Sequence, residues 1–206
     1  MTWIVGDGPL RPAVEAAVAE AGVGGRVRFL GLRKDIPAVL SASDVLERVS
    51  AANAPAFVER LRTQAVDLLV SLACPQILRR DVLSVPPRGA INLHGALLPD
   101  YRGLLPAFWV LANGEPHTGA TVHYMHEEVD LGPVILQERV PIRPDDTVHT
   151  LVQRTKLEVG VPPLVRALEQ IEQGADRPTD PRAGRAFGYP DADAIRRFRA
   201  RGRRFV

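Results

Sequence analysis

Short apolar runs of strand length alternate along this chain with segments of helical periodicity, and this alternation constrains the fold more than any other feature. We predict strands at residues 3–5, 27–30, 68–72, 89–93, 118–125 and 134–140, and helices at 13–21, 36–42, 56–64, 106–111 and 147–173. The pattern is typical of an α/β fold with a doubly wound, mostly parallel sheet. Thr147 and the two aspartates before it are candidate caps for a long C-terminal helix, which Pro162 and Pro163 could interrupt or kink.

Composition sets the broad class of the protein. A chain of 206 residues with 46% hydrophobic content is large enough for one packed domain. Its single cysteine, Cys74, excludes an intramolecular disulfide and a multi-cysteine metal site, so we interpret it as a buried core thiol in a reducing compartment. No apolar run approaches the roughly 20 residues that span a bilayer, and the start lacks a signal-peptide pattern. We therefore expect a cytoplasmic protein without a membrane span.

The strand at residues 89–93 leads into two polar residues, Asn92 and His94. Residues two apart on a strand point to the same face, and ligands of open α/β sheets bind beyond the carboxyl ends of the strands. With Asp130 downstream, the chain offers an amide, an imidazole and a carboxylate, which can stabilise an oxyanion and transfer protons without a metal ion. Taken singly, Asn92 and Asp130 would more often be turn or capping residues. Together, the three residues indicate group transfer at a carbonyl.

Residues 66–155 also carry several motifs in a fixed order. They are Asn-x-His at 92–94, Leu-Leu-Pro-x-Tyr-Arg-Gly at 97–103, Asn-Gly-Glu at 113–115, Gly-Ala-Thr-Val-His at 119–123 and Asp-x-Gly-Pro-Val-Ile-x-Gln at 130–137. This segment resembles the formyltransferases that use 10-formyltetrahydrofolate. The resemblance implies a Rossmann-like catalytic domain in which Asn92 and His94 stabilise the oxyanion. Asp130 would orient the imidazole and a water molecule that relays protons.

The same resemblance implies a pterin-binding segment at 76–78 and a loop at 125–130 that closes over the pterin ring. The segment at 76–78 would supply backbone hydrogen bonds and apolar walls to the pterin, although Ile77 and Leu78 could equally be core residues. Ala96 departs from the pattern, because a serine commonly precedes Leu-Leu-Pro. The residues that the resemblance assigns to the folate are Gln76, Ile77, Leu78, Met125, Glu127, Val129 and Asp130.

The two ends of the chain differ from this central segment. Residues 1–45 resemble a fragment of a GT-B glycosyltransferase, and we expect this leader to replace the usual first βαβ unit of a catalytic domain at 1–173. Residues 174–206 are rich in Pro, Gly and Arg, and we expect an irregular, basic tail that Phe187 and Tyr189 anchor. We interpret its arginine run as a solvated segment and expect no nucleic-acid partner.

The acceptor of the formyl group is less constrained than the reaction. The run at 101–109 and the glycosyltransferase-like leader favour a primary amine on a nucleotide- or glycan-linked amino-sugar. Phosphoribosylglycinamide and methionyl-tRNA are alternative acceptors. Two other hypotheses stay open: a hydrolase that passes the formyl group to water, and an inactive relic that only binds folate or a partner.

Overall fold

A computed structural model of the chain describes residues 2–5, 16, 19, 27–30, 52–72, 74, 76–180 and 183–206. These residues fall into two compact units, the first comprising residues 1–92 with 124–127 and the second residues 93–123 with 128–206. The predicted helix at 36–42 and most of the one at 13–21 lie outside the described residues.

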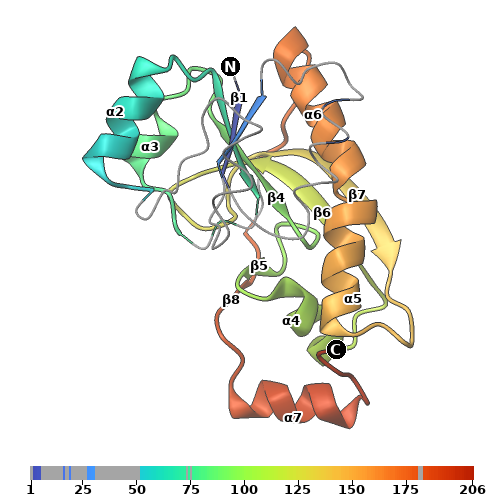
Figure 1. Ribbon diagram of the computed structural model, residues 1–206. Helices are drawn as coiled ribbons and strands as arrows, with labels where there is room; N and C mark the ends of the chain where they lie inside the picture. Colours follow the sequence, from blue (N-terminus) through green and yellow to red (C-terminus); the bar gives the residue numbers. More distant parts are fainter. Residues whose placement is uncertain are drawn as a thin grey trace. The chain divides into compact units, whose positions relative to one another are not determined.

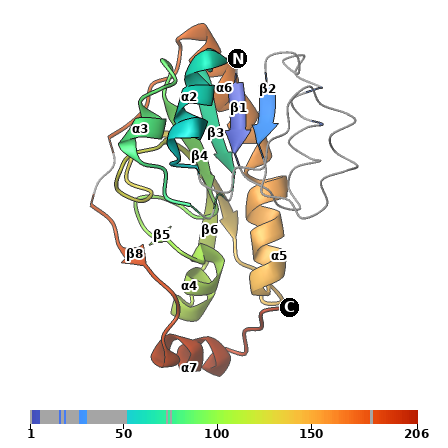
Figure 2. The same cartoon turned by 60° about the vertical axis from the view of Figure 1, so that its left-hand side comes forward.

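The first unit is built on parallel strands (Figures 1 and 2). Strand β1 (Thr2–Val5) pairs in parallel with β2 (Val27–Leu30) on one side and with β3 (Leu68–Leu72) on the other. Strand β4 (Ala90–His94) follows β3 in the order of the sheet. The unit also contains α2 (Pro55–Thr63) and the short α3 (Arg80–Leu83). All four predicted strands are confirmed here, and α2 confirms the helix predicted at 56–64.

Apolar side chains of α2, β3, α3 and β4 form the core of this unit. Every residue of β3 is buried, as expected for a strand covered on both faces. Cys74 is partly buried and packs against this core, and burial raises the pKa of its thiol. The buried members of the cluster are Ala52, Phe57, Val58, Leu61, Val66, Leu69, Leu78, Val82 and Ala90.

The second unit contains the end of β4 and two long strands that follow it in the sheet. Strand β6 (His117–Tyr124) and strand β7 (Val134–Pro141) pair antiparallel, with a register shift between Val122 and His123. Helix α4 (Pro106–Asn113) starts with a proline, and a left-handed glycine, Gly114, ends it. The paired strands and the helix are thus confirmed where the periodicity predicts them.

The C-terminal residues are ordered more regularly than the predicted irregular tail. Strand β8 (Ala186–Phe187) pairs in parallel with β5 (Arg102–Gly103), and α7 (Ala192–Ala200) packs against α4 (Figure 1). The anchor of α7 is Phe198, which is 1% exposed and stacks on Phe108 with ring centroids 4.9 Å apart. Phe187 packs against the same core, whereas Tyr189 is 81% exposed and anchors nothing.

The predicted long helix at 147–173 is divided into three parts. Helix α5 (Val148–Gln153) passes into a π-helical turn, η3 (Arg154–Glu158), and α6 (Val161–Gln173) follows (Figure 1). Thr147 caps α5 by accepting a hydrogen bond from the Thr150 N–H at 3.1 Å. Pro162 and Pro163 lie in the first turn of α6, where a missing N–H costs little, so the predicted helix is interrupted before them and α6 is not kinked.

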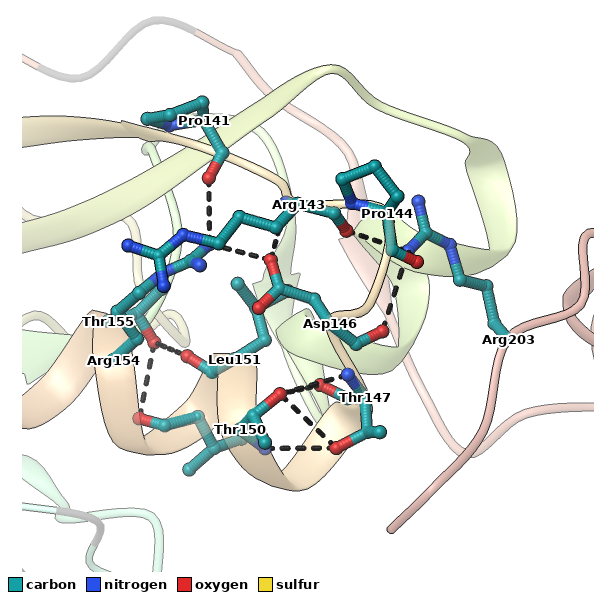
Figure 3. Close-up of polar contacts among 11 residues, drawn as sticks. Pro141, Arg143, Pro144, Asp146, Thr147, Thr150, Leu151, Arg154, Thr155 and Arg203 are labelled. Carbon is teal, nitrogen blue, oxygen red and sulfur yellow. Dashed lines mark hydrogen bonds and ion pairs between the residues drawn. The ribbon is translucent and has the colours of Figure 1, made fainter.

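A buried ion pair holds the start of this segment (Figure 3). The Arg154 and Asp146 side chains are each 5% exposed, and Arg154 Nη2 donates to Asp146 Oδ2 at 2.6 Å and to the Pro141 carbonyl at 2.7 Å. The same carboxylate oxygen accepts the Arg143 N–H at 2.6 Å. Arg154 Nε and Nη1 are buried without a partner. This pair therefore connects the loop after β7 to the π turn.

The mixed α/β architecture confirms the predicted fold class. In the part of the chain that the structure describes, no helix has the length and apolar composition needed to cross a membrane.

Candidate active site

Strand β4 carries two of the three predicted catalytic side chains at its carboxyl end. The apolar residues Ile91 and Leu93 are buried, Asn92 is half-buried, and the side chain of His94 is 6% exposed. The alternation of the pleated strand places Asn92 and His94 on one face, since they are two residues apart. The structure thus supplies the strand that the sequence predicts for them.

Both ring nitrogens of His94 face oxygen atoms of the protein. Nε2 lies 2.8 Å from the carbonyl oxygen of Tyr101, and Nδ1 lies 3.4 Å from Asp130 Oδ2. A carbonyl can only accept, so Nε2 must carry the hydrogen in this contact. In the neutral ring, Nδ1 then presents its lone pair and can take up a proton. The resulting imidazolium would form an ion pair with Asp130.

Asp130 receives three contacts that favour its charged form. Its Oδ2 accepts the Gly103 N–H at 2.8 Å, and its Oδ1 lies 3.6 Å from His123 Nε2. Burial raises the pKa of this carboxyl, but the contact with His123, the charge of His94 and the Gly103 N–H outweigh burial and lower it to about 2. Asp130 is therefore ionised at neutral pH.

The same surroundings act in the opposite sense on His94. Burial lowers the pKa of its imidazole, while the charge of Asp130 and the hydrogen bond to Tyr101 oppose that effect. The charges of His123 and Lys156 lower it further. The ring is therefore neutral in the resting site and able to act as a proton acceptor.

The backbone around these groups is strained at two residues. Tyr101 and Asp130 have φ values of 58° and 52°, in the left-handed region that side chains other than glycine rarely occupy. Strain of this kind persists where the surrounding structure imposes it, often at functional sites. Gly103, with φ at 88°, is needed for a different reason, because a Cβ there would lie 2.4 Å from the Phe187 carbonyl oxygen. The β5–β8 pairing thus places the N–H that binds Asp130.

A buried hydroxyl supports the loop that follows His94. Thr121, which is fully buried, donates to the Ala96 carbonyl at 2.7 Å and accepts the Leu98 N–H at 3.1 Å. Gln137 Nε2 donates to the Leu98 carbonyl at 2.7 Å. Although Ala96 lacks the hydroxyl common at its position, the backbone here is held by Thr121 and Gln137, both of which lie in the motifs noted above.

A cavity of about 590 Å³ adjoins the Tyr101 side of this loop. The Tyr101 hydroxyl contacts Glu115 Oε1 at 2.5 Å and accepts from Asn113 Nδ2 at 3.2 Å, and its ring stacks on Phe187 with centroids 5.1 Å apart. The exposed side chains of Arg139 and Arg185 also line the cavity. The cavity therefore combines aromatic surface with polar and charged groups.

Most of the predicted folate-binding residues belong to the first unit. Gln76 Oε1 accepts the Ala52 N–H at 2.8 Å, and the Ile77 carbonyl accepts from Asn53 at 2.8 Å. Leu78 is 1% exposed and is part of the core, whereas the Ile77 side chain is 64% exposed. Core packing therefore accounts for Leu78 but not for Ile77.

The predicted loop at 125–130 is divided between the two units. In the first unit, the Met125 N–H donates to the Ala90 carbonyl at 2.7 Å, and Glu127 Oε1 lies 3.5 Å from Arg80 Nε. In the second unit, Val129 is 39% exposed and precedes Asp130. A role of these residues in folate binding stays a prediction.

Two further side chains that interact with Asp130 are not among the predicted site residues. His123 is 1% exposed, while His117, His126 and His149 are exposed. Its place in the Gly-Ala-Thr-Val-His motif was the available signal. Lys156, in η3, acts electrostatically on both His94 and Asp130, and a lone lysine in a helical segment gave no signal. Among the residues with described positions, no three His, Cys, Asp or Glu side chains gather as a metal site.

Comparison with known proteins identifies the family. A methionyl-tRNA formyltransferase of Anaeromyxobacter sp. (strain K) is 45% identical over 126 residues, which are 61% of this chain and 40% of that protein. The chain thus spans about two fifths of the length of this curated relative.

Solved structures share the fold. A glycinamide ribonucleotide transformylase 1 from Symbiobacterium toebii superposes with a TM-score of 0.72 at 27% identity, over 87% of this chain and 94% of that one. A sugar N-formyltransferase from Shewanella sp FDAARGOS_354 superposes with a TM-score of 0.74 at 22% identity, over 96% and 85%. The family described as formyl transferase matches residues 16–168, so this chain belongs to the formyl transferase family.

Proposed function

We propose that this protein transfers the formyl group of 10-formyltetrahydrofolate to a primary amine. The observation that carries the proposal is the contact between His94 and an ionised Asp130. His94 lies at the end of β4, two residues after Asn92. Membership of the formyl transferase family supports the reaction class and the folate donor.

The amine nitrogen would attack the formyl carbon, forming a C–N bond while the carbonyl electrons move to oxygen. The Asn92 amide would donate a hydrogen bond to this oxyanion, and loss of such a donor typically costs about 2.7–4 kcal/mol of transition-state stabilisation. The neutral His94 ring, through Nδ1, would accept the proton that the amine loses, and Asp130 would stabilise the imidazolium. Return of that proton to N10 as the C–N10 bond breaks would release tetrahydrofolate and the formamide.

For the acceptor, we propose an amino-sugar linked to a nucleotide or glycan. The cavity beside Tyr101 supports this choice, since its aromatic faces, hydroxyl and amide groups and exposed arginines suit a sugar that carries a phosphate or a base. Tyr101 joins this cavity to the site, because its carbonyl binds His94 while its ring lines the cavity.

A second acceptor is favoured by a different observation. The 45% identity with a methionyl-tRNA formyltransferase is higher than the identity with the sugar or glycinamide ribonucleotide enzymes. Methionyl-tRNA is therefore the second candidate, and the structural likeness to the glycinamide ribonucleotide transformylase adds phosphoribosylglycinamide to the panel of acceptors.

The test is conversion of 10-formyltetrahydrofolate to tetrahydrofolate by the purified full chain, with each acceptor class supplied in turn. Asn92→Ala should lower turnover by about 10²–10³-fold, whereas Gln173→Ala, which removes an exposed amide at the end of α6, should not change it. Release of formate in the absence of any amine would show that the protein is a hydrolase and not a transferase. A folded protein that binds folate but shows no turnover with any of the acceptors would support the relic hypothesis and overturn ours.

A further inference from the structure

The π turn η3 places a lysine beside the His94 strand end. A π turn holds one more residue per turn than an α-helix, and such turns are frequent at functional sites. Here it spans Arg154–Glu158 and carries Lys156, one of two lysines in the chain. The first two residues of the turn have polar contacts with neighbouring segments: Arg154 pairs with Asp146, and Thr155 donates to the Leu151 carbonyl at 2.8 Å (Figure 3).

The stem of Lys156 packs directly on Gly95, the residue after His94. A Cβ added to Gly95 would lie 3.5 Å from Lys156 Cε, 3.8 Å from its Cγ and 3.5 Å from Thr155 Oγ1. The lysine side chain therefore covers the backbone that leads out of β4. The lysine interacts electrostatically with both His94 and Asp130, and its side chain is half-buried.

Two features of its surroundings shift the pKa of Lys156 in opposite directions. Burial lowers the pKa of its ammonium, and the carboxylate of Asp130 raises it. In return, the lysine charge lowers the pKa of His94. The other ionisable groups of this region have partners of their own or face solvent: Arg154 pairs with Asp146, His123 contacts Asp130, and Glu158 of the same turn is exposed.

We propose that Lys156 is a positioning residue that acts through charge, keeping the His94 ring neutral beside the Asp130 carboxylate. The neutral ring donates through Nε2 to Tyr101, and the lone pair of Nδ1, which faces Asp130, can accept the proton of an attacking amine. The catalytic consequence rests on the proposed function, but the coupling between the lysine and the pair does not. The two can therefore be tested separately.

Nuclear magnetic resonance of the full chain with ¹³C-labelled lysine tests the coupling without any assay of activity. In a Lys34→Arg background the remaining side-chain signal belongs to Lys156, and its titration midpoint can be followed directly. Asp130→Asn should lower this midpoint by about half a pH unit or more, whereas Asp180→Asn, at an exposed position, should leave it unchanged. Equal midpoints in the Asp130 and Asp180 variants would overturn the proposal.

The reverse measurement follows the imidazole of His94 by ¹⁵N resonance, with His94→Gln used to assign the signal. Because thermodynamic coupling is reciprocal, Lys156→Met should raise the titration midpoint of His94, and Lys156→Arg should keep it near the wild-type value. Lys156→Gln repeats the test if the methionine variant does not fold. A His94 midpoint that is the same with Met, Gln and Arg would overturn the proposal, whether or not the protein transfers formyl groups.

Where transfer is measured, the pH profile separates a role through charge from a purely structural one. In Lys156→Met the acid limb of kcat/KM should move to higher pH by the same amount as the His94 midpoint. A uniform loss of activity with an unmoved acid limb would contradict the proposed role of the lysine.

Discussion

The buried pair of Arg154 and Asp146 allows a quantitative prediction about stability. Asp146→Asn would leave a guanidinium that is 5% exposed without its carboxylate, and its Nε and Nη1 already lack partners. Removing one member of a buried ion pair typically costs about 3–5 kcal/mol. We expect Asp146→Asn to lower the free energy of unfolding by that amount.

Arg154→Met should cost less, for two structural reasons. It removes two buried nitrogens without partners, each of which carries a penalty of about 1–3 kcal/mol, and the remaining Asp146 carboxylate still accepts the Arg143 N–H at 2.6 Å. We therefore expect a loss of about 1–3 kcal/mol. The double variant should be no less stable than Asp146→Asn alone, since no unpaired charge remains.

The assay is urea unfolding followed by the fluorescence of Trp109, which is 7% exposed and lies in the same core cluster as Leu151 of α5. Trp3→Phe makes it the only tryptophan, since the chain has two. Arg143→Met, at an exposed side chain, is the matched control. The reasoning is refuted if the two single losses add within about 0.5 kcal/mol, or if Arg154→Met proves the more damaging change.

Three further predictions concern packing and pH. Phe198→Ala should destabilise the second unit by about 3–5 kcal/mol, because the ring is 1% exposed, and thermal unfolding of the variant measures the loss. Gly119→Ala should also unfold at lower temperature, since its Cβ would lie 2.0 Å from the Glu138 carbonyl oxygen; an unchanged melting temperature would contradict that close approach. The surroundings of Asp130 lower its pKa to about 2, from an ordinary value of 3.8, so its contribution to stability is complete above about pH 4 and disappears as the pH falls toward 2. Asp130→Asn should therefore flatten the stability profile in that range, as acid titration followed by circular dichroism would detect.

The sequence predicts the strand carrying Asn92 and His94 because a short apolar run with strong end signals leaves little choice of secondary structure. The same holds for β6 and β7, whose pairing follows from their length and the short connection between them. Contacts made by backbone atoms could not be predicted in this way. The Tyr101 carbonyl and the Gly103 N–H position His94 and Asp130, but no side-chain pattern reveals a carbonyl or an N–H.

Two other features were missed for physical reasons. The arginine-rich end of the chain was interpreted as solvated, although Ala194 and Phe198, four residues apart, are buried on one face of α7. Two apolar residues in a charged segment give a weak periodic signal. The π turn was missed because apolar residues continue on both sides of it, and a shift of helical phase by one residue is small in a segment of this length.

The π turn makes the length of its segment as important as the identity of its residues. Each residue of an α-helix advances the chain by about 100° around the axis, so deleting one residue from Arg154–Glu158 would let α5 run on as an ordinary helix and turn Lys156 away from Gly95. Loss of a single residue at this place would thus remove the lysine charge from the surroundings of His94 and Asp130, while the side chains of Asn92, His94 and Asp130 stayed the same.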